Sequence, residues 1–302
     1  MAPASGLDMA EVGAHGKIVL YYVLGLLAFH FGIHLLSLRM SPAYRALPLP
    51  GGKKDDNSSK NNGNKHEDVP SMPIVGTQPQ VLTCQDLIVV PVATAICLFY
   101  LGACFNIPNT LPNRWFGQSP LFEYGAYLHC AFAVYEMIVY SICGKTIEFY
   151  LHHVFVFNVY FFGVALHSVQ FYLAWAGLVE VTNIPLSSIS IMGRLHMKKN
   201  PLYLLSGVGL YVSYVLSRLI SMALALGGLC ADMYHHPAET WGECSKSHIS
   251  FCVLSCFIVY AMSAFWFKKI HNGLMKHLNG KGTEGGAELD KMTVPMSKPK
   301  EA

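Results

Sequence analysis

Apolar residues along the chain gather in seven runs, each about as long as the 20 residues that an α-helix needs to cross a bilayer. The runs are continuously apolar and do not alternate with polar positions, which distinguishes them from the strands of a membrane barrel. Helices are expected in lipid because they satisfy their own backbone hydrogen bonds. We place the spans at residues 18–38, 86–106, 120–142, 147–166, 168–189, 202–229 and 248–267.

One polar segment separates the first apolar run from the other six. Its stretch 51–69, GGKKDDNSSKNNGNKHEDV, has no aromatic and almost no aliphatic side chains, so it cannot bury a core. We therefore expect a disordered loop over 39–84. The predicted fold is an all-α polytopic membrane protein, with one peripheral transmembrane helix at 18–38, a six-helix core domain over 85–270 and a tail over 271–302.

The composition supports the membrane class independently of the pattern. The 302 residues are 53% hydrophobic and 13% charged, whereas about 25% of an average soluble domain is charged. No basic cluster with interleaved aromatic residues is present in the sequence, so we expect no nucleic-acid partner. Asp8 and Glu11 stand where a cleaved signal peptide would carry positive charge, so we expect the first run to remain as a helix.

The distribution of Lys and Arg predicts the orientation of the spans. Seventeen of the 21 basic residues lie in segments that would share one side of the membrane, and three lie on the other side. Cytoplasmic loops carry the excess of positive charge in membrane proteins. We therefore expect the loop 39–84 and the tail 271–302 in the cytosol, and the N-terminal segment 1–17 in the lumen.

The chain ends in MSKPKEA, where Lys298 and Lys300 have the spacing of a dilysine retrieval signal for the endoplasmic reticulum. Such a signal acts in the cytosol, in agreement with the predicted orientation. We expect the protein in the endoplasmic reticulum membrane. The alternative is a solvated polar tail whose two lysines have no targeting role.

Two of the nine cysteines bracket a predicted lumenal loop, Cys230 and Cys244. In an oxidising lumen they could form a disulfide worth about 3 kcal/mol for a loop of this size. Two free thiols are the alternative, and the sequence leaves both open.

Ionisable side chains inside the predicted core carry the candidate chemistry, because such groups are costly at membrane depth and mark functional sites by default. They are Glu136, Glu180, Arg218, His129, His152, His153 and His167. His30 and His34 have the i, i+4 spacing of metal ligands. However, the HxxHH boxes of membrane di-iron enzymes do not occur in the sequence, so we expect no metal site.

Glu136 and His153 lie at matching depths. Each is seven residues from the short turn that joins 120–142 to 147–166, about 10 Å at 1.5 Å per residue, so the two side chains can meet. The carboxylate would fix the imidazole tautomer and leave the other ring nitrogen as a base or nucleophile. His152 points about 100° away, so we expect one imidazole to face a cavity and the other a neighbouring helix. The alternative is a buried pair that only joins two helices, worth about 1 kcal/mol.

Glu180 and Arg218 lie in the fifth and sixth runs. Pro185 removes a backbone donor and disfavours helix at the residue before it, which predicts a break near 183–185. Irregular backbone at this depth is tolerated only against protein or a wet cavity, which places Glu180 beside an interior opening near the cytosolic face. The alternative is a kinked helix with Glu180 snorkelling or paired to a His. We expect Arg218 to snorkel to the lumenal interface.

The order of these residues resembles the TLC (TRAM–Lag–CLN) domain family over about residues 85–270. The matching features are an acidic residue ending the third span, a His pair opening the fourth, an acidic residue before a Pro-containing break in the fifth, and an Arg late in the sixth. These residues are Glu136, His152, His153, Glu180 and Arg218. The resemblance implies a six-helix membrane core that acts on or senses lipids.

The family includes ceramide synthases, which are acyl-CoA-dependent N-acyltransferases of the endoplasmic reticulum. The resemblance would make His152 and His153 the acyl-transfer residues, oriented by Glu136 or Glu180. It would assign Arg218 to binding of acyl-CoA as co-substrate, with membrane lipids and a sphingoid base as partners and no tightly bound cofactor.

The best-known catalytic signature of ceramide synthases has an HDxSD element between the His pair and the later acidic residue. The corresponding segment here is LHSVQFYLAWAGLVE, which has neither Asp. The chain therefore looks more similar to the non-classical TLC-domain subgroup that is linked to membrane lipid composition. We expect a role in lipid homeostasis. A ceramide-synthase-like acyltransferase is the alternative, and a cargo or translocon-associated factor is a third possibility.

Overall fold

The computed structural model describes residues 8–47, 78–143 and 147–278, which form helices and turns without a strand. Two segments depart from α-helix: η1 is a 3₁₀-helix and η2 is a π-helix. In chain order the elements are α1 (Met9–Met40), α2 (Pro42–Arg45), α3 (Gln78–Asn106), α4 (Leu111–Phe116), α5 (Pro120–Cys143), α6 (Ile147–Ala165), α7 (Gln170–Gly177), η1 (Leu178–Thr182), α8 (Asn183–Arg194), α9 (Pro201–Ser213), η2 (Tyr214–Ser221), α10 (Met222–His235) and α11 (Lys246–Leu278).

The predicted all-α membrane fold is confirmed. Within the described residues, six helical stretches are long and apolar enough to cross a membrane. Each of the six corresponds to a single predicted run, and one of them is a continuous helix over Pro201–His235, made of α9, η2 and α10. The remaining predicted run, 168–189, is occupied by α7, η1 and α8, which follow one another without a turn.

The break in the fifth run differs from the prediction. The irregular segment is η1, Leu178–Thr182, which ends before the predicted position at 183–185. Pro185 lies in the first turn of α8, where a missing backbone N–H leaves no hydrogen bond unmade. Pro185 therefore starts the second half of the helix instead of ending the first half.

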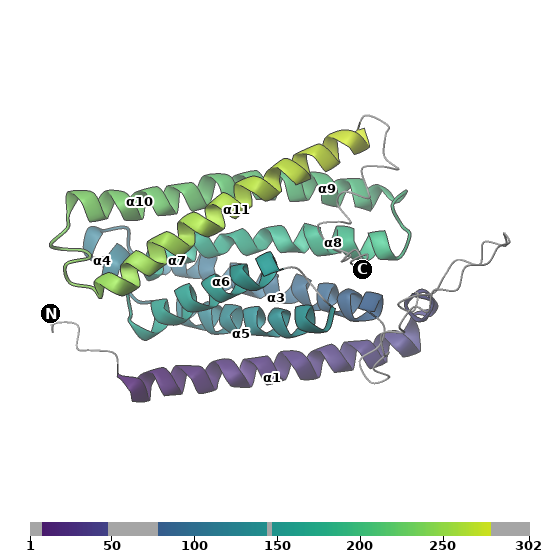
Figure 1. The fold of residues 1–302 in the computed structure, drawn as a ribbon, viewed down its shortest axis with the longest axis horizontal. Helices are drawn as coiled ribbons and strands as arrows, with labels where there is room; N and C mark the ends of the chain where they lie inside the picture. The colour runs from purple at the N-terminus through teal and green to yellow at the C-terminus, as the bar shows by residue number, and fades with distance from the viewer. Residues whose placement is uncertain (1–7, 48–77, 144–146, 279–302) are drawn as a thin grey trace, which may run out of the picture.

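The helices form an elongated bundle with two distinct ends (Figure 1). Helix α1 runs along one side and packs on α5, while α9, η2, α10 and α11 lie on the opposite side. We call one end the basic end, where α1, α5, α8 and α11 finish, and the other the distal end, where α10 finishes and α11 begins. The basic end is the side that the Lys and Arg count assigns to the cytosol.

Helix α1 is attached to the core by histidine–tyrosine hydrogen bonds. His15 Nδ1 lies 2.6 Å from the Tyr127 hydroxyl, and His30 Nδ1 lies 2.7 Å from the Tyr135 hydroxyl. Both tyrosines belong to α5. His30 and His15 thus have structural partners on α5.

The outer surface of the bundle exposes large apolar side chains. Phe105, Leu205 and Leu224 are 81%, 65% and 71% exposed. A soluble monomer rarely exposes contiguous apolar surface, whereas lipid tails are as apolar as leucine and accept it without cost. Such a surface is that of a multi-pass membrane protein.

Several predictions concern segments at the edges of the described residues. The loop predicted as disordered over 39–84 is helical at both ends, because α1 continues to Met40, α2 follows it, and α3 begins at Gln78. The middle of that loop, and the dilysine pair Lys298 and Lys300, lie outside the described residues.

The two cysteines that bracket the distal loop are both free thiols in the structure, Cys230 and Cys244. Burial raises the pKa of the Cys244 thiol to about 11, so the thiol stays protonated at neutral pH. Of the two alternatives, the structure contains the unbridged one.

Candidate functional site

A cavity of about 330 Å³ opens at the basic end and reaches the middle of the bundle. Its volume lies within the range of small-molecule sites. Its walls come from α3, α5, α6, α8, α9, η2 and α11, with η1 at its deep end. The site residues predicted from the sequence all line it: Glu136, His152, His153, Glu180 and Arg218.

The predicted contact between α5 and α6 is present. His153 Nε2 lies 3.4 Å from Glu136 Oε2, and both side chains are nearly buried. The other carboxylate oxygen, Glu136 Oε1, accepts hydrogen bonds from Gln85 Nε2 at 2.8 Å and from the Tyr140 hydroxyl at 3.1 Å. Gln85 and Tyr140 thus hold this carboxylate against one imidazole, the arrangement that fixes a tautomer and supports a positive charge on the ring.

A second histidine–carboxylate pair lies deeper in the cavity. His129 Nε2 is 3.5 Å from Glu180 Oε1, and His129 Nδ1 is hydrogen-bonded to the Tyr100 hydroxyl at 3.1 Å. Asn183 Nδ2 donates to Glu180 Oε2 at 2.7 Å. The pairing of Glu180 with a histidine was an alternative in the sequence analysis, and the structure contains it.

The position of Glu180 differs from the prediction. It stands 14 residues before Arg194, the end of α8, which is about 21 Å at 1.5 Å per residue. Glu180 therefore lies at the deep end of the cavity and not beside the cytosolic face. The irregular η1 segment that carries it does line a cavity, as expected for non-α backbone at membrane depth.

Both members of the His152–His153 pair face the cavity, whereas the helical geometry predicted that one would face a neighbouring helix. The two rings meet edge to face, with centroids 5.1 Å apart, and His152 also packs on Trp266 of α11 at 5.8 Å. Within the described chain, the buried Nδ1 of His152 has no hydrogen-bond partner.

The prediction for Arg218 is wrong. Arg218 is 4% exposed and stands 17 residues from each end of the continuous helix Pro201–His235, so it lies at mid-depth and does not snorkel. Its Nε donates to Thr182 Oγ1 at 2.9 Å, and its guanidinium lies 5.4 Å from the ring centre of Tyr214. The sequence analysis placed the end of the span at residue 229, which made Arg218 look closer to the lumenal interface.

The cavity mouth contains a further ion pair that the sequence analysis did not find. Arg194 Nη2 contacts the Asp86 carboxylate, and Arg194 Nε donates to Thr83 Oγ1 at 2.9 Å. This pair joins α8 to α3. Glu148 of α6 and Lys269 of α11 line the cavity near the same end.

A narrow apolar extension continues from the deep end of the cavity towards the distal end. Its first part has a volume of about 30 Å³ and shares His129, His152 and Glu180 with the main cavity. A second part of about 10 Å³ adjoins it and shares Met222 and Cys256 with the first. The cavity therefore leads into two small spaces with mainly apolar walls.

Sequence reasoning missed two residues that complete the site, Gln85 and Thr182, and it found no partner for a third, His129. His129 was identified as an ionisable core residue without a partner, because nothing local links it to Glu180, 51 residues later. Gln85 and Thr182 carry no charge, so the search for ionisable groups passed over them.

No metal-binding cluster of three or more His, Cys, Asp or Glu side chains occurs among the residues that the structure describes. In the cavity His153 contacts Glu136 and His129 contacts Glu180, and such histidine–carboxylate pairs suit proton transfer and hydrogen bonding.

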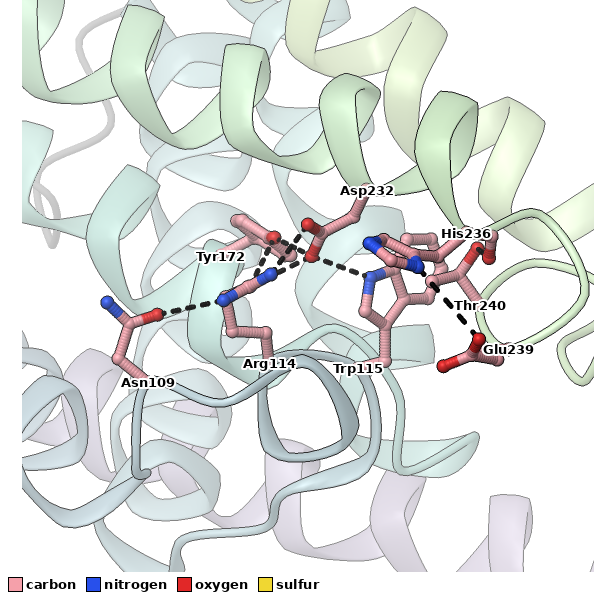
Figure 2. A network of polar contacts seen from close by, with 8 residues as sticks. All are labelled: Asn109, Arg114, Trp115, Tyr172, Asp232, His236, Glu239 and Thr240. Atoms are coloured by element: carbon pink, nitrogen blue, oxygen red, sulfur yellow. Dashed lines mark hydrogen bonds and ion pairs between the residues drawn. The ribbon is translucent and has the colours of Figure 1, made fainter.

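A second buried polar cluster lies at the distal end, where α4, α7 and α10 meet (Figure 2). Arg114 donates to both oxygens of Asp232, from Nε at 2.8 Å and from Nη2 at 2.6 Å. Trp115 Nε1 donates to Asp232 at 3.1 Å, and the Tyr172 hydroxyl also donates to it. Because the carboxylate accepts hydrogen bonds from side chains on α4 and α7, this cluster holds α10 to both helices.

Together, the apolar surface and the buried polar cavity define a polytopic helical membrane protein with an internal site. The family model described as the TLC domain matches residues 81–272, which is more than half of the chain. The chain belongs to the TLC-domain family, as the order of its acidic, His and Arg residues suggested. No curated protein matches the chain.

Proposed function

We propose that this protein binds or processes lipid acyl chains in its cavity and acts in membrane lipid homeostasis. The observation that carries the proposal is the continuity between the polar cavity and its apolar extension, which share His129, His152 and Glu180. A polar chamber with an apolar continuation, inside a bundle surrounded by lipid, suits an amphipathic ligand.

We further propose that the protein resides in the endoplasmic reticulum membrane, with the basic end and C-terminus in the cytosol and the N-terminus in the lumen. The Lys and Arg asymmetry supports the orientation. The spacing of Lys298 and Lys300 supports the compartment. In this orientation the cavity mouth opens to the cytosol.

The test is the lipid profile of cells that express the wild type or a double variant, His152→Ala with His153→Ala, at matched levels. The chain offers a matched control in its other adjacent pair, His235 and His236, which lies at the distal end away from the cavity. We expect wild type and the control double variant to change the same lipid class, and the cavity variant to leave it unchanged. Equal changes with all three proteins would contradict a role for the cavity histidines.

The alternative function is a ceramide-synthase-like, acyl-CoA-dependent N-acyltransferase. The unpartnered Nδ1 of His152 and the carboxylate-bound ring of His153 favour it, because they offer a free ring nitrogen beside a supported imidazole. One imidazole would take a proton from a sphingoid amine as the amine nitrogen attacks the carbonyl carbon of the thioester. The C–S bond would break, an amide would form, and the imidazolium would return the proton to the sulfur so that CoA leaves as the thiol.

This alternative has a direct assay. Purified wild type incubated with palmitoyl-CoA and sphinganine should release free thiol and form the N-acyl product, and the His152→Ala variant should not. Absence of product with a folded wild type would exclude this substrate pair and leave acyl-chain binding as the function.

A further inference from the structure

Arg218 lines the cavity and has a hydrogen-bond donor that no described residue accepts. Its side chain is 4% exposed, and within the described residues its Nη1 is buried without a hydrogen-bond partner. Nε of the same guanidinium is satisfied by Thr182 Oγ1 at 2.9 Å. A buried donor without an acceptor is costly, and more so when it is charged, so the site is incomplete without a further acceptor.

The backbone around this donor is irregular on both sides. Arg218 belongs to the π-helical η2 (Tyr214–Ser221), and Thr182 belongs to the 3₁₀-helical η1 (Leu178–Thr182). π-Helical turns are rare and often occur at functional sites. Two adjacent departures from α-helix at mid-membrane depth, joined by a hydrogen bond, indicate a position that is built for more than packing.

The group that would partner Arg218 Nη1 is a neutral hydrogen-bond acceptor and not a further anion. Two carboxylates, Glu136 and Glu180, already line the same cavity as the guanidinium. An additional anion would meet their repulsion in a low-dielectric interior, whereas a neutral oxygen acceptor would not. A carbonyl oxygen meets this requirement because it accepts hydrogen bonds without carrying a net charge.

The surroundings also set the direction of the ligand. Met222 follows Arg218 by one helical turn towards the distal end and lines both parts of the apolar extension. Glu148 and Lys269 line the cavity towards the basic end. A hydrocarbon tail therefore belongs on the distal side of Arg218, and a polar group belongs on the basic side.

We infer that Arg218 Nη1 binds the carbonyl oxygen of an ester- or thioester-linked acyl chain, with the chain in the apolar extension and the polar remainder of the lipid towards the basic end. This inference rests on the proposed function, because it assumes that the cavity takes an acyl lipid. It selects neutral acyl esters and thioesters over free fatty acids and over hydrocarbons of the same length.

The test uses the purified full chain in lipid nanodiscs and three probes that share one hydrocarbon tail: methyl oleate, oleate and octadecene. Binding of radiolabelled methyl oleate is measured, together with its displacement by the other two. We expect methyl oleate to bind about tenfold or more tightly than either competitor, the factor that one hydrogen bond to a charged donor supplies.

A second measurement begins with the wild type alone. The infrared carbonyl stretch of methyl oleate labelled with ¹³C at its carbonyl should move to lower frequency when the ester is bound, because a guanidinium donor weakens the C=O bond. In the variant Arg218→Met the shift should disappear and the affinity should fall by about tenfold. The control Arg45→Met, outside the cavity in α2, should keep both.

The outcomes separate the inference from the function on which it rests. If octadecene displaces methyl oleate as well as the ester itself does, or the carbonyl frequency does not change, the role of Arg218 is overturned while acyl-chain binding stands. If no probe binds to the folded wild type, the proposed function fails as well. If Arg218→Met does not fold, the probe series and the infrared shift of the wild type still decide the inference.

Discussion

The imidazole of His153 and the carboxylate of Glu136 are held 3.4 Å apart by two antiparallel helices, α6 and α5. Gln85 of α3 fixes the far side of the same carboxylate through a 2.8 Å hydrogen bond. The contact therefore depends on three helices at once, and a change in any of them alters the electrostatic environment of the histidine.

Replacing the carboxylate by its amide isolates this effect. In Glu136→Gln the hydrogen bonds from Gln85 and Tyr140 can persist, but the negative charge beside His153 is lost, so the imidazolium is no longer supported. We expect a folded protein that no longer changes the lipid profile. The comparison is lipid analysis against Glu239→Gln, an exposed carboxylate at the distal end. A lipid change equal to that of the wild type would show that Glu136 only joins helices.

The deeper pair of His129 and Glu180 should contribute a measurable coupling energy. A double-mutant cycle with His129→Ala and Glu180→Ala, followed by the free energy of unfolding in detergent, isolates their interaction. We expect a coupling of about 1 kcal/mol, the magnitude of polar contacts between transmembrane helices. Strictly additive effects would mean that the 3.5 Å contact contributes nothing to stability.

The distal cluster should matter for stability and not for ligand binding. Asp232→Asn removes the charge that Arg114 binds, so a partly buried guanidinium loses its counter-ion. We expect the free energy of unfolding to fall by about 2–3 kcal/mol, with acyl-probe affinity of the folded protein unchanged. Thermal unfolding and probe binding are measured on the same preparation. A loss of affinity without a loss of stability would place Asp232 in the ligand site after all.

The orientation is tested by glycosylation. Asn57-Ser58-Ser59 has the form of an acceptor sequence, and the predicted orientation places it in the cytosol, where it stays unmodified. An acceptor sequence added before Met1 should instead be modified in the lumen. A shift in electrophoretic mobility that is sensitive to glycosidase reports each site. Modification of Asn57 would show that the orientation is the reverse of the predicted one, with the cavity mouth in the lumen and out of reach of cytosolic acyl-CoA.

Most of the fold could be predicted because apolar length alone defines membrane helices. The run at 120–142 became α5, Pro120–Cys143, and the run at 147–166 became α6, Ile147–Ala165. The contact between Glu136 and His153 followed from equal spacing on either side of one short turn. Both predictions needed only helical geometry and sequence neighbours.

The rest depended on how distant helices pack. Local sequence does not show that His129 meets Glu180, since they lie on helices that are not consecutive. The count of apolar residues ended the sixth span at 229 because polar residues such as Asp232 follow. The helix nevertheless continues to His235, since the Arg114 guanidinium compensates the charge of Asp232. The predicted depth of Arg218 was wrong for that reason.

The π-helical segment Tyr214–Ser221 also sets the rotational phase between the two halves of one long helix. Each π-helical turn holds about one residue more than an α-helical turn, so the same sequence wound as uninterrupted α-helix would have a different phase beyond this segment. Met222 would then leave the wall of the apolar extension, and Asp232 would face away from Arg114. The segment thus acts as an angular adjustment that lets one continuous helix serve the cavity in the middle of the membrane and the clamp at its far end together.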